Sequence, residues 1–317
     1  MSRVINFGSL NIDYVYAAPH FVRGGETLAA TARSIHAGGK GLNQSIALAR
    51  AGLATLHAGA VGLDGLFLKT LLSDAGVDAT HVAVDPEHPS GHTVIQVTPK
   101  GENAILYYAG TNATIDAEFV RGIIGAAGAE DAVLLQNETS AVADIIDAAL
   151  EKGLRVIFNP APFDDSVTAL PLERLFALCL NVTEACGILG LDPEVDGSRP
   201  DAGERMLAAL AAKFPKTVII LTLGSKGAAW VRPGEAPGFV AAFPVEAVDT
   251  TGAGDTFAGY AVRALLSDDA DEAAFATGMR FAAMAAALSV TKPGAANSIP
   301  MLDAVKQALA ANEARDF

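Results

Sequence analysis

A glycine-rich segment late in the chain carries the residues best suited to phosphoryl transfer. It reads Asp249-Thr250-Thr251-Gly252-Ala253-Gly254-Asp255 and directly precedes a predicted helix over 256–266. The two glycines permit a tight turn, and free N–H groups at the positive end of a helix form an anion site. Asp255 at the helix start would stay ionised and could accept the proton of a hydroxyl group that attacks a phosphoryl group. A glycine turn followed by Asp is also a common structural feature, and only the longer string favours the catalytic interpretation.

A second glycine-rich segment, Gly38-Gly39-Lys40-Gly41-Leu42-Asn43-Gln44, leads into a predicted helix over 43–53. Its glycines let the backbone approach a ligand closely, and Lys40 and Asn43 could donate hydrogen bonds to hydroxyl groups. The segment is not a Walker loop, and Gln44 stands where a dinucleotide-binding motif has its third glycine. A nicotinamide dehydrogenase is therefore disfavoured. An ordinary junction between a loop and a helix stays open as the alternative.

Two polar residues follow the first predicted strand, over 3–7. Asn11 and Asp13 alternate, so both can face one side of the chain. In open α/β sheets ligands bind beyond the carboxyl ends of the strands. An Asp that accepts hydrogen bonds from two hydroxyl groups is typical of sugar binding, whereas an Asx turn is the structural alternative.

Two further segments have both a structural and a functional interpretation. Asn181 and Glu184 are three residues apart, which is the spacing of a capping box at a helix start. The same pair could lie near the metal and phosphates of a nucleotide. The segment 221–227 is a predicted strand that ends in a glycine turn, and an ordinary hairpin is its structural alternative.

The elements that must position these residues alternate between strands and helices. Strands are predicted over 3–7, 55–61, 132–136, 154–158 and 217–223, and helices over 43–53, 66–75, 142–150, 256–266, 272–290 and 302–312. The strands are apolar throughout, which indicates parallel strands that are buried on both faces. We therefore expect an α/β fold of three layers, α/β/α, with a mostly parallel central sheet.

Two segments interrupt this alternation. The segment 10–36 contains an alternating run over 27–35, and the segment 91–108 is a predicted hairpin with strands over 93–97 and 104–108. We expect these two insertions, 10–36 and 91–108, to form a small β-sheet lid. The remainder would form the α/β core of a single domain over residues 1–317.

Composition narrows the function classes. With 36 acidic against 22 basic residues the formal net charge is -14, which argues against nucleic acid or an anionic membrane as a partner. The 51% of hydrophobic residues is too high for a disordered chain, yet no apolar run approaches the ~18 residues that span a bilayer. Cys179 and Cys186 cannot form a disulfide framework, so we expect buried thiols in a cytoplasmic protein.

Taken in order, these motifs resemble the PfkB carbohydrate kinase family, in its ribokinase-like branch, from Gly8 to Pro300. The resemblance implies a three-layer α/β core with a small β-sheet lid that pairs subunits into a homodimer. It also implies transfer of the γ-phosphoryl group of ATP to a primary sugar hydroxyl, with ribose as the first choice and ribose 5-phosphate as product. Mg²⁺ would accompany ATP, and a monovalent cation, K⁺, would activate the enzyme.

The resemblance also implies a role for individual residues. Asp255 would be the catalytic base, and the anion hole would be formed by Gly252, Ala253 and Gly254. The sugar would be held by Asn11, Asp13, Gly39, Lys40, Asn43 and Glu138. Asn181 and Glu184 would lie near magnesium and phosphate, and the nucleotide loop would contain Thr222, Gly224, Ser225 and Gly227. The K⁺ site would be formed, mostly through main-chain carbonyls, by Asp249, Thr251, Ser289, Lys292, Gly294 and Ser298.

One position departs from the family pattern. Ala283 stands where ribokinases often carry a polar side chain near adenine, so the base preference stays open. Kinases for another sugar, a sugar acid or a nucleoside remain alternatives. A sugar-phosphate kinase would need a cationic clamp, for which Arg23, Arg33 and Lys100 are the obvious lid residues. A non-catalytic sugar-binding sensor is an alternative of another class, and the presence of Asp255 and its glycine turn argues against it.

Overall fold

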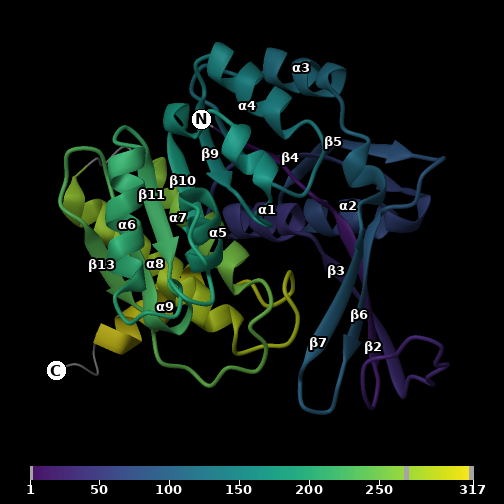
Figure 1. Cartoon of the computed structure of the whole chain (residues 1–317). Coiled ribbons are helices and arrows are strands. Elements are labelled where there is room, and N and C mark those ends of the chain that lie inside the picture. Colours follow the sequence, from purple (N-terminus) through teal and green to yellow (C-terminus); the bar gives the residue numbers. More distant parts are fainter. Residues whose placement is uncertain (1–2, 268–270, 314–317) are drawn as a thin grey trace.

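The computed structural model describes residues 3–267 and 271–313, and its central feature is a nine-stranded sheet (Figure 1). The strands lie in the order β13-β12-β11-β10-β9-β8-β1-β4-β5. Their bounds are β1 (Val4–Phe7), β4 (Thr55–Gly62), β5 (Asp78–Asp85), β8 (Ala132–Gln136), β9 (Arg155–Asn159), β10 (Ala177–Asn181), β11 (Val218–Thr222), β12 (Gly227–Val231) and β13 (Gly238–Ala241). From β5 to β11 neighbouring strands are parallel, whereas β12 and β13 are antiparallel additions at one edge. The expected mostly parallel α/β architecture is confirmed.

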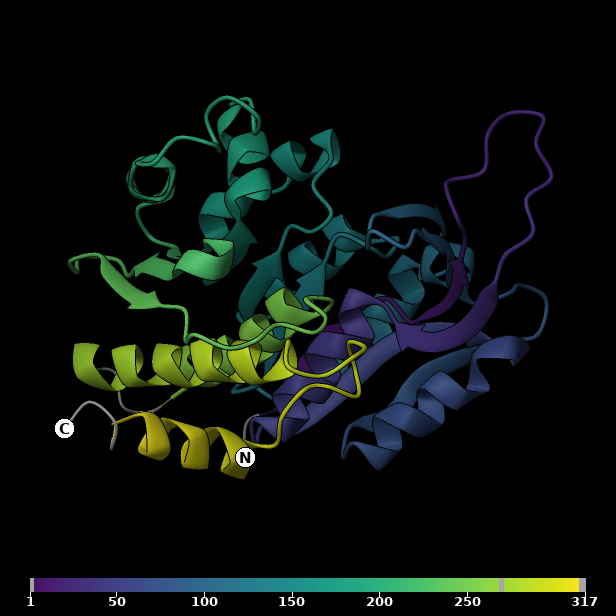
Figure 2. The same cartoon turned by 90° about the horizontal axis from the view of Figure 1, so that it is seen from below.

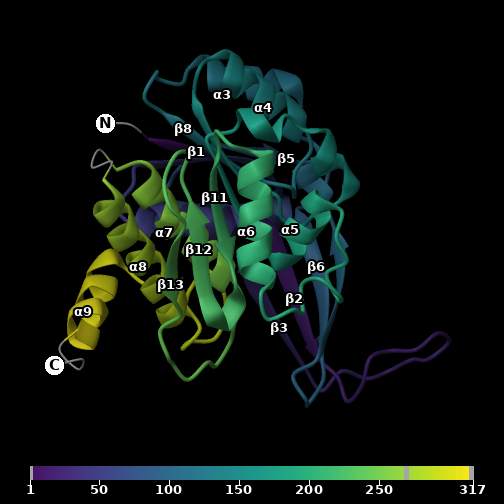
Figure 3. The same ribbon diagram turned by 60° about the vertical axis from the view of Figure 1, so that its left-hand side comes forward.

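Helices cover both faces of this sheet (Figure 3). One face carries α1 (Lys40–Arg50), α2 (Leu66–Asp74), α7 (Ala253–Leu265), α8 (Glu272–Ser289) and α9 (Leu302–Glu313). The other carries α3 (Ala117–Gly125), α4 (Val142–Glu151), α5 (Val182–Leu189) and α6 (Ala202–Lys213). Along β8, Leu134 packs into the first core, while Val133 and Leu135 pack into the second. Side chains alternate between the two faces of a strand, which is why β8 to β11 are apolar between their ends, whereas β1 and β4 carry the buried polar residues Asn6 and His57 in their interiors.

A smaller sheet of four strands projects from the edge of the layered body (Figure 1). Its order is β3-β2-β6-β7, with β2 (Asn11–Ala17), β3 (Ala32–Gly38), β6 (Gly91–Val97) and β7 (Asn103–Tyr108). The connection between β2 and β3 extends away from the body (Figure 2). Both expected insertions contribute to this sheet, and the predicted hairpin over 91–108 is confirmed.

Several predicted boundaries are wrong, including the end of α1, which lies at Arg50 instead of Leu53. The alternating run over 27–35 is not a strand at its start, because pairing with β2 begins only at Ala32. α1 begins at Lys40 instead of Asn43, and α7 begins at Ala253 instead of Thr256. In both helices a glycine with positive φ stands at the N-cap, Gly39 at 96° and Gly252 at 75°, and the next glycine lies within the first turn. Glycine lowers the expected helicity of those turns, so sequence patterns place both helix starts too late.

The single domain expected over 1–317 also includes residues 1–2, 268–270 and 314–317, which lie outside the described residues. Within residues 3–267 and 271–313, no helix combines the length and the apolar character needed to cross a membrane.

Candidate active site

The candidate site lies where five neighbouring parallel strands end. β1, β8, β9, β10 and β11 have their carboxyl ends at the same edge of the sheet. Polar residues stand at or just beyond these ends: Asn11, Glu138, Asn159, Asn181 and Thr222. The N-termini of α1 and α7 reach the same edge, because side chains from their first turns contact one another there. This is the place where open α/β sheets bind ligands.

Asp255 is the most firmly held side chain of the site. It lies in the first turn of α7, and only 9% of the residue is exposed. Its Oδ2 accepts a hydrogen bond of 3.0 Å from Nδ2 of Asn43, and its Oδ1 accepts one of 2.9 Å from Nε2 of Gln44. α1 and α7 can approach this closely because a side chain at Gly259 would collide with Ala47. The structure thus joins two motifs that are more than two hundred residues apart.

The first turn of α7 fits an anion. An α-helix leaves the N–H groups of its first turn without partners inside the helix. Gly252 stands at the N-cap with φ 75° and offers no side chain to cap them. A Cβ at this position would also lie 2.8 Å from that of Ala295. Gly252 and Gly254 can therefore present backbone N–H groups to a phosphoryl group beside Asp255, whereas the N–H of Ala253 donates to the carbonyl of Thr250 at 3.3 Å in this structure.

Lys40 lies among three carboxylates. Asp255, followed by Glu138 and Glu184, raises the pKa of Lys40 against the opposing effect of burial, so the side chain stays protonated. Oε2 of Glu138 accepts hydrogen bonds from the backbone N–H of Lys40 and from the hydroxyl of Ser9. Burial raises the pKa of Glu138, although Lys40 and Ser9 act in the opposite direction.

The smaller sheet supplies Asn11 and Asp13. Oδ1 of Asn11 accepts a hydrogen bond of 2.7 Å from Nδ2 of Asn112, and Oδ1 of Asp13 accepts one of 2.6 Å from the hydroxyl of Thr93. Burial raises the pKa of Asp13, while Thr93 and then His36 lower it. Sequence patterns gave no role to Asn112 and Thr93, which orient these two polar side chains.

Asn181 and Glu184 form the capping box that starts α5. The Asn181 side chain accepts from the backbone N–H of Glu184, and the Glu184 carboxylate accepts from that of Asn181. The pair also borders a cavity of about 140 Å³ together with Lys40, Gly254 and Asp255. Burial raises the pKa of Glu184, with the backbone of Asn181 and the charge of Lys40 acting against it. The structural and functional interpretations of this motif are therefore compatible.

A second cavity, of about 570 Å³, adjoins the first at Thr222 and Gly254. Gly224, Ser225 and Gly227 form part of its wall. Its opposite wall is apolar and is formed by Phe257, Ala283, Ala286, Ala287 and Val290. β11 and β12 form an antiparallel hairpin here, as the structural alternative predicted, and its turn borders the cavity. An apolar slot that opens toward helix N–H groups suits a nucleotide base and its phosphates.

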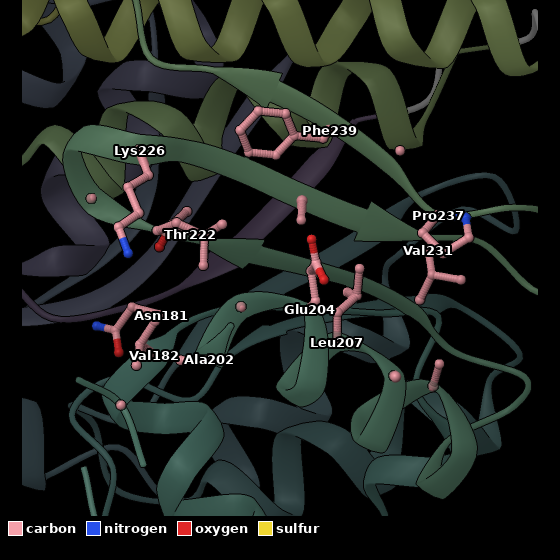
Figure 4. Close-up of a pocket in the computed structure, with 18 of the residues that line it drawn as sticks. Asn181, Val182, Ala202, Glu204, Leu207, Thr222, Lys226, Val231, Pro237 and Phe239 are labelled. Atoms are coloured by element: carbon pink, nitrogen blue, oxygen red, sulfur yellow. The ribbon is translucent and has the colours of Figure 1, made fainter. Parts of the chain in front are cut away.

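A larger cavity, of about 880 Å³, lies on the α6 side of the same hairpin (Figure 4). Asn181, Thr222 and Lys226 lie toward one end of it and Val231 and Pro237 toward the other (Figure 4). It contains none of Asp255, Lys40 and Asn43. Its size alone therefore does not make it the reaction site.

Asp249 joins the two loops of the expected cation site. Its Oδ1 accepts from the backbone N–H of Thr251 and its Oδ2 from that of Gly294, both at 2.9 Å. Burial would raise the pKa of Asp249, but these hydrogen bonds outweigh it and keep the pKa below its usual value. The hydroxyls of Ser289 and Ser298 donate to carbonyls three residues earlier in the chain. Ligands for a cation would thus come from the backbone, as the resemblance implies.

Among the residues that the structure describes, no group of three or more His, Cys, Asp or Glu side chains could hold a metal ion. The chemistry of the site nevertheless fits Mg²⁺ bound with a nucleotide, because Mg²⁺ keeps several waters and takes much of its coordination from substrate phosphates. Asn181 and Glu184, on the small cavity, are the side chains that would face it.

Comparisons with known proteins agree with this geometry. A family model described as "pfkB family carbohydrate kinase" matches residues 1–302. Ribokinase from Haemophilus influenzae is 36% identical over 297 residues, which cover 92% of this chain and 94% of the relative. The structure of Cryptococcus neoformans ribokinase in complex with ADP matches with a TM-score of 0.86 and 32% identity over 97% of this chain and 100% of that one. Arabidopsis thaliana ribokinase complexed with ribose and ATP matches with a TM-score of 0.82 and 29% identity over 97% and 98%.

Proposed function

Because the chain belongs to the pfkB family of carbohydrate kinases, we propose that it transfers the γ-phosphoryl group of ATP to the primary hydroxyl of ribose. The family resemblance inferred from the motifs is confirmed. The substrates follow from the relatives, which are ribokinases, one of them solved with ribose and ATP. The observation that carries the proposal is Asp255, held by Asn43 and Gln44 at the N-terminus of α7.

In the proposed reaction Asp255 takes the proton of the primary hydroxyl. The hydroxyl oxygen forms a bond to the γ-phosphorus while the bond from that phosphorus to the bridging oxygen of ADP breaks. The backbone N–H groups of Gly252 and Gly254 stabilise the charge on the transferred group. Lys40, protonated among its carboxylates, adds a positive charge on the sugar side of the same site. Mg²⁺ bound with ATP would neutralise charge on the phosphates.

The sugar is proposed to lie between the small sheet and α1. Asn11 and Asp13 would form hydrogen bonds to the sugar from the small sheet. On the opposite side, near the start of α1, hydrogen bonds would come from Gly39, Lys40, Asn43 and Glu138. The nucleotide would occupy the 570 Å³ cavity, with Thr222, Gly224, Ser225 and Gly227 along the phosphates and ribose and with Ala283 near the base. A K⁺ ion would be held by Asp249, Thr251, Ser289, Lys292, Gly294 and Ser298, mostly through backbone carbonyls, and would order the anion hole.

The charges favour a neutral acceptor over a sugar phosphate. Arg33 lies over the ring of Tyr14, at 5.3 Å from its centroid. Tyr14 follows Asp13 in the same strand and therefore points to the opposite face of the small sheet. Arg33 is thus turned away from the face that carries Asp13. A phosphorylated acceptor would therefore meet the carboxylates of Asp13 and Glu138 and the single cation of Lys40, without a clamp from Arg33.

The small sheet is proposed to act as a lid and to pair two subunits into a homodimer. Its β7 edge exposes Ile105, Leu106, Tyr107 and Tyr108. An exposed apolar edge strand is commonly covered by another chain. A kinase that uses ATP and carries two free, buried cysteines fits a cytoplasmic location.

A substrate panel tests the proposed function. ADP release would be measured with ribose, 2-deoxyribose, hexoses, sugar acids and nucleosides, and with 5-deoxyribose as a matched control that lacks the primary hydroxyl. We expect the highest kcat/KM for ribose and no phosphorylation of 5-deoxyribose. A higher kcat/KM for another acceptor would replace ribose as the substrate. Ribose binding without ADP release would instead support the non-catalytic sensor.

A further inference from the structure

Four carboxamide side chains form a buried array behind the candidate base. They belong to Asn6 in β1, Gln44 in α1, Gln136 at the end of β8 and Asn159 at the end of β9. Asn6, Gln44 and Gln136 are fully buried, and Asn159 is 9% exposed. Burying so many amide groups is costly unless their hydrogen bonds are made. This arrangement of polar groups in the core therefore calls for an explanation.

Gln44 is the member of the array that touches Asp255. It follows Asn43 in α1, yet its Nε2 donates both to Oδ1 of Asp255 and to Oδ1 of Asn159, each at 2.9 Å. Asn43 donates to the other carboxylate oxygen of Asp255 at 3.0 Å. A carboxylate with a donor on each oxygen cannot rotate freely. It keeps further lone pairs, so it can still accept a proton.

The array also decides which end of the Gln44 amide faces Asp255. Oε1 of Gln44 accepts a hydrogen bond of 2.7 Å from Nε2 of Gln136. Turning the Gln44 amide around would place its oxygen against Oδ1 of Asp255 and its NH₂ group against that of Gln136. Both contacts would be repulsive, so Gln136 keeps the Gln44 donor directed at the carboxylate.

The orientation of Gln136 is fixed in turn from the far side of β1. Nε2 of Gln136 also donates to Oδ1 of Asn6 at 3.0 Å, and Nδ2 of Asn6 donates to the hydroxyl of Ser45 at 2.8 Å. Since that hydroxyl accepts from Asn6, its own proton is free for Nδ1 of His57, 2.8 Å away. Burial lowers the pKa of His57 to about 4, so the ring is neutral and its Nδ1 can accept. Gln136 thus donates in two directions, to Gln44 on the side of Asp255 and to Asn6 on the side of His57, and the amide of Asn6 is oriented because its Nδ2 also donates to the carbonyl of Gly41 at 2.9 Å.

We propose that Gln44 is a positioning residue for the reaction, held by Gln136 and Asn6 so that it always donates to Asp255. The proposal rests on the role of Asp255 as base given above. A neutral amide donor stabilises the ionised carboxylate and fixes its plane. It does so without a second cation, which would form an ion pair with Asp255 and weaken it as a base.

The test replaces Gln44 by Met, which has a similar volume and no donor. One hydrogen bond to a charged group is worth enough to lower kcat by roughly 10- to 100-fold. We expect the sugar KM to change little, since Asn11, Asp13 and Asn43 are retained. The loss should appear in kcat and not in the sugar KM, because the Asp255 carboxylate is no longer held in one plane. Gln136→Met should lower kcat by a smaller factor, because it frees the Gln44 amide to turn.

Thr55→Val is the matched control. Thr55 is also buried, and its hydroxyl donates to the carbonyl of Leu53 at the opposite end of β4 from the site. It should lower the unfolding temperature without changing kcat or the sugar KM. Should Gln44→Met fail to fold, Gln136→Met provides the same readouts.

Different results would overturn the role of Asp255 as base and the role of Gln44 as its positioning residue. If Asp255→Asn abolishes turnover while Gln44→Met keeps wild-type kcat, Gln44 does not position the base and the inference is overturned. If Asp255→Asn keeps near-wild-type turnover, the proposed base itself is wrong.

Discussion

Oδ2 of Asp249 accepts a hydrogen bond of 2.9 Å from the backbone N–H of Gly294, which lies 45 residues further along the chain. This contact ties the loop before α7 to the loop after α8. The first of these loops leads directly into Gly252 and the anion hole. Any ion that orders the pair of loops would therefore act on the phosphoryl site without touching the sugar.

We accordingly expect K⁺ to raise kcat with little effect on the sugar KM. Turnover would be measured in KCl and in tetramethylammonium chloride at equal ionic strength, since the organic cation is too bulky for the loops. Asp249→Ala should raise the K⁺ concentration that gives half-maximal activation, because the two loops lose their link. Equal rates in both salts would contradict this prediction.

Asp255→Asn separates the base from the sugar-binding carboxylate. The variant keeps the shape of the side chain but cannot take a proton, so kcat should fall by roughly 10²–10⁴-fold while the sugar Kd changes little. Asp13→Asn should instead mainly raise the sugar KM, because Asp13 would bind hydroxyls equally in the ground and transition states. Circular dichroism of both variants controls for misfolding. A large loss of kcat in Asp13→Asn with an unchanged KM would reverse the two assignments.

The lowered pKa of His57 predicts that the folded protein loses stability in acid. Its pKa is lowered from 6.5 to about 4 in the folded protein, so the unfolded chain binds the extra proton first as the pH falls. The free energy of unfolding should therefore decrease from about pH 6.5 downward and level off near pH 4, by about 3 kcal/mol from this group.

His57→Gln provides the comparison, since Gln keeps an acceptor for Ser45 but does not titrate. Urea unfolding at pH 7 and pH 4.5 would show a smaller loss of stability in the variant than in the wild type. Identical pH dependence in the two proteins would exclude His57 as the source.

Leu106 on β7 tests the proposed homodimer. It is 72% exposed in the single chain. If the small sheets pair, Leu106→Asp should place a charge at the interface and shift the protein to a monomer. Light scattering at micromolar concentration measures the change. Val195→Asp, at a site 64% exposed outside the small sheet, is the matched control and should leave the mass unchanged. A wild-type protein that is already monomeric would refute the homodimer.

Sequence patterns predicted most of the strands that are apolar because helices cover both faces, although β10 is equally apolar and buried and was missed. The strand over 132–136 is apolar because helices cover both its faces, and the motif over 249–255 needs glycines where an anion approaches a helix. β5 and β13 lie at the edges of the large sheet, have exposed residues and gave no such signal. α6 is rich in alanine, which does not mark a buried face clearly.

The array behind Asp255 shows why part of the site could not be predicted. Gln44 stands inside a recognised motif, yet nothing local tells whether its amide faces the sugar or the sheet. Gln136 and Asn159 gave a weak signal, as single polar residues that end apolar strands. Their contact with Gln44 depends on the packing of α1 over β8 and β9, which only the assembled structure shows.

Only Gly8, Ser9 and Leu10 separate β1 of the large sheet from β2 of the small one. Asn11 and Asp13 thus belong to one body, and Asn43 and Asp255 to the other. A sugar that binds all four side chains would connect the small sheet to the α/β core. The size of the sugar would decide whether the site can assemble around ATP. A water molecule makes too few hydrogen bonds to engage all four side chains, so ATP hydrolysis without an acceptor sugar should be slow.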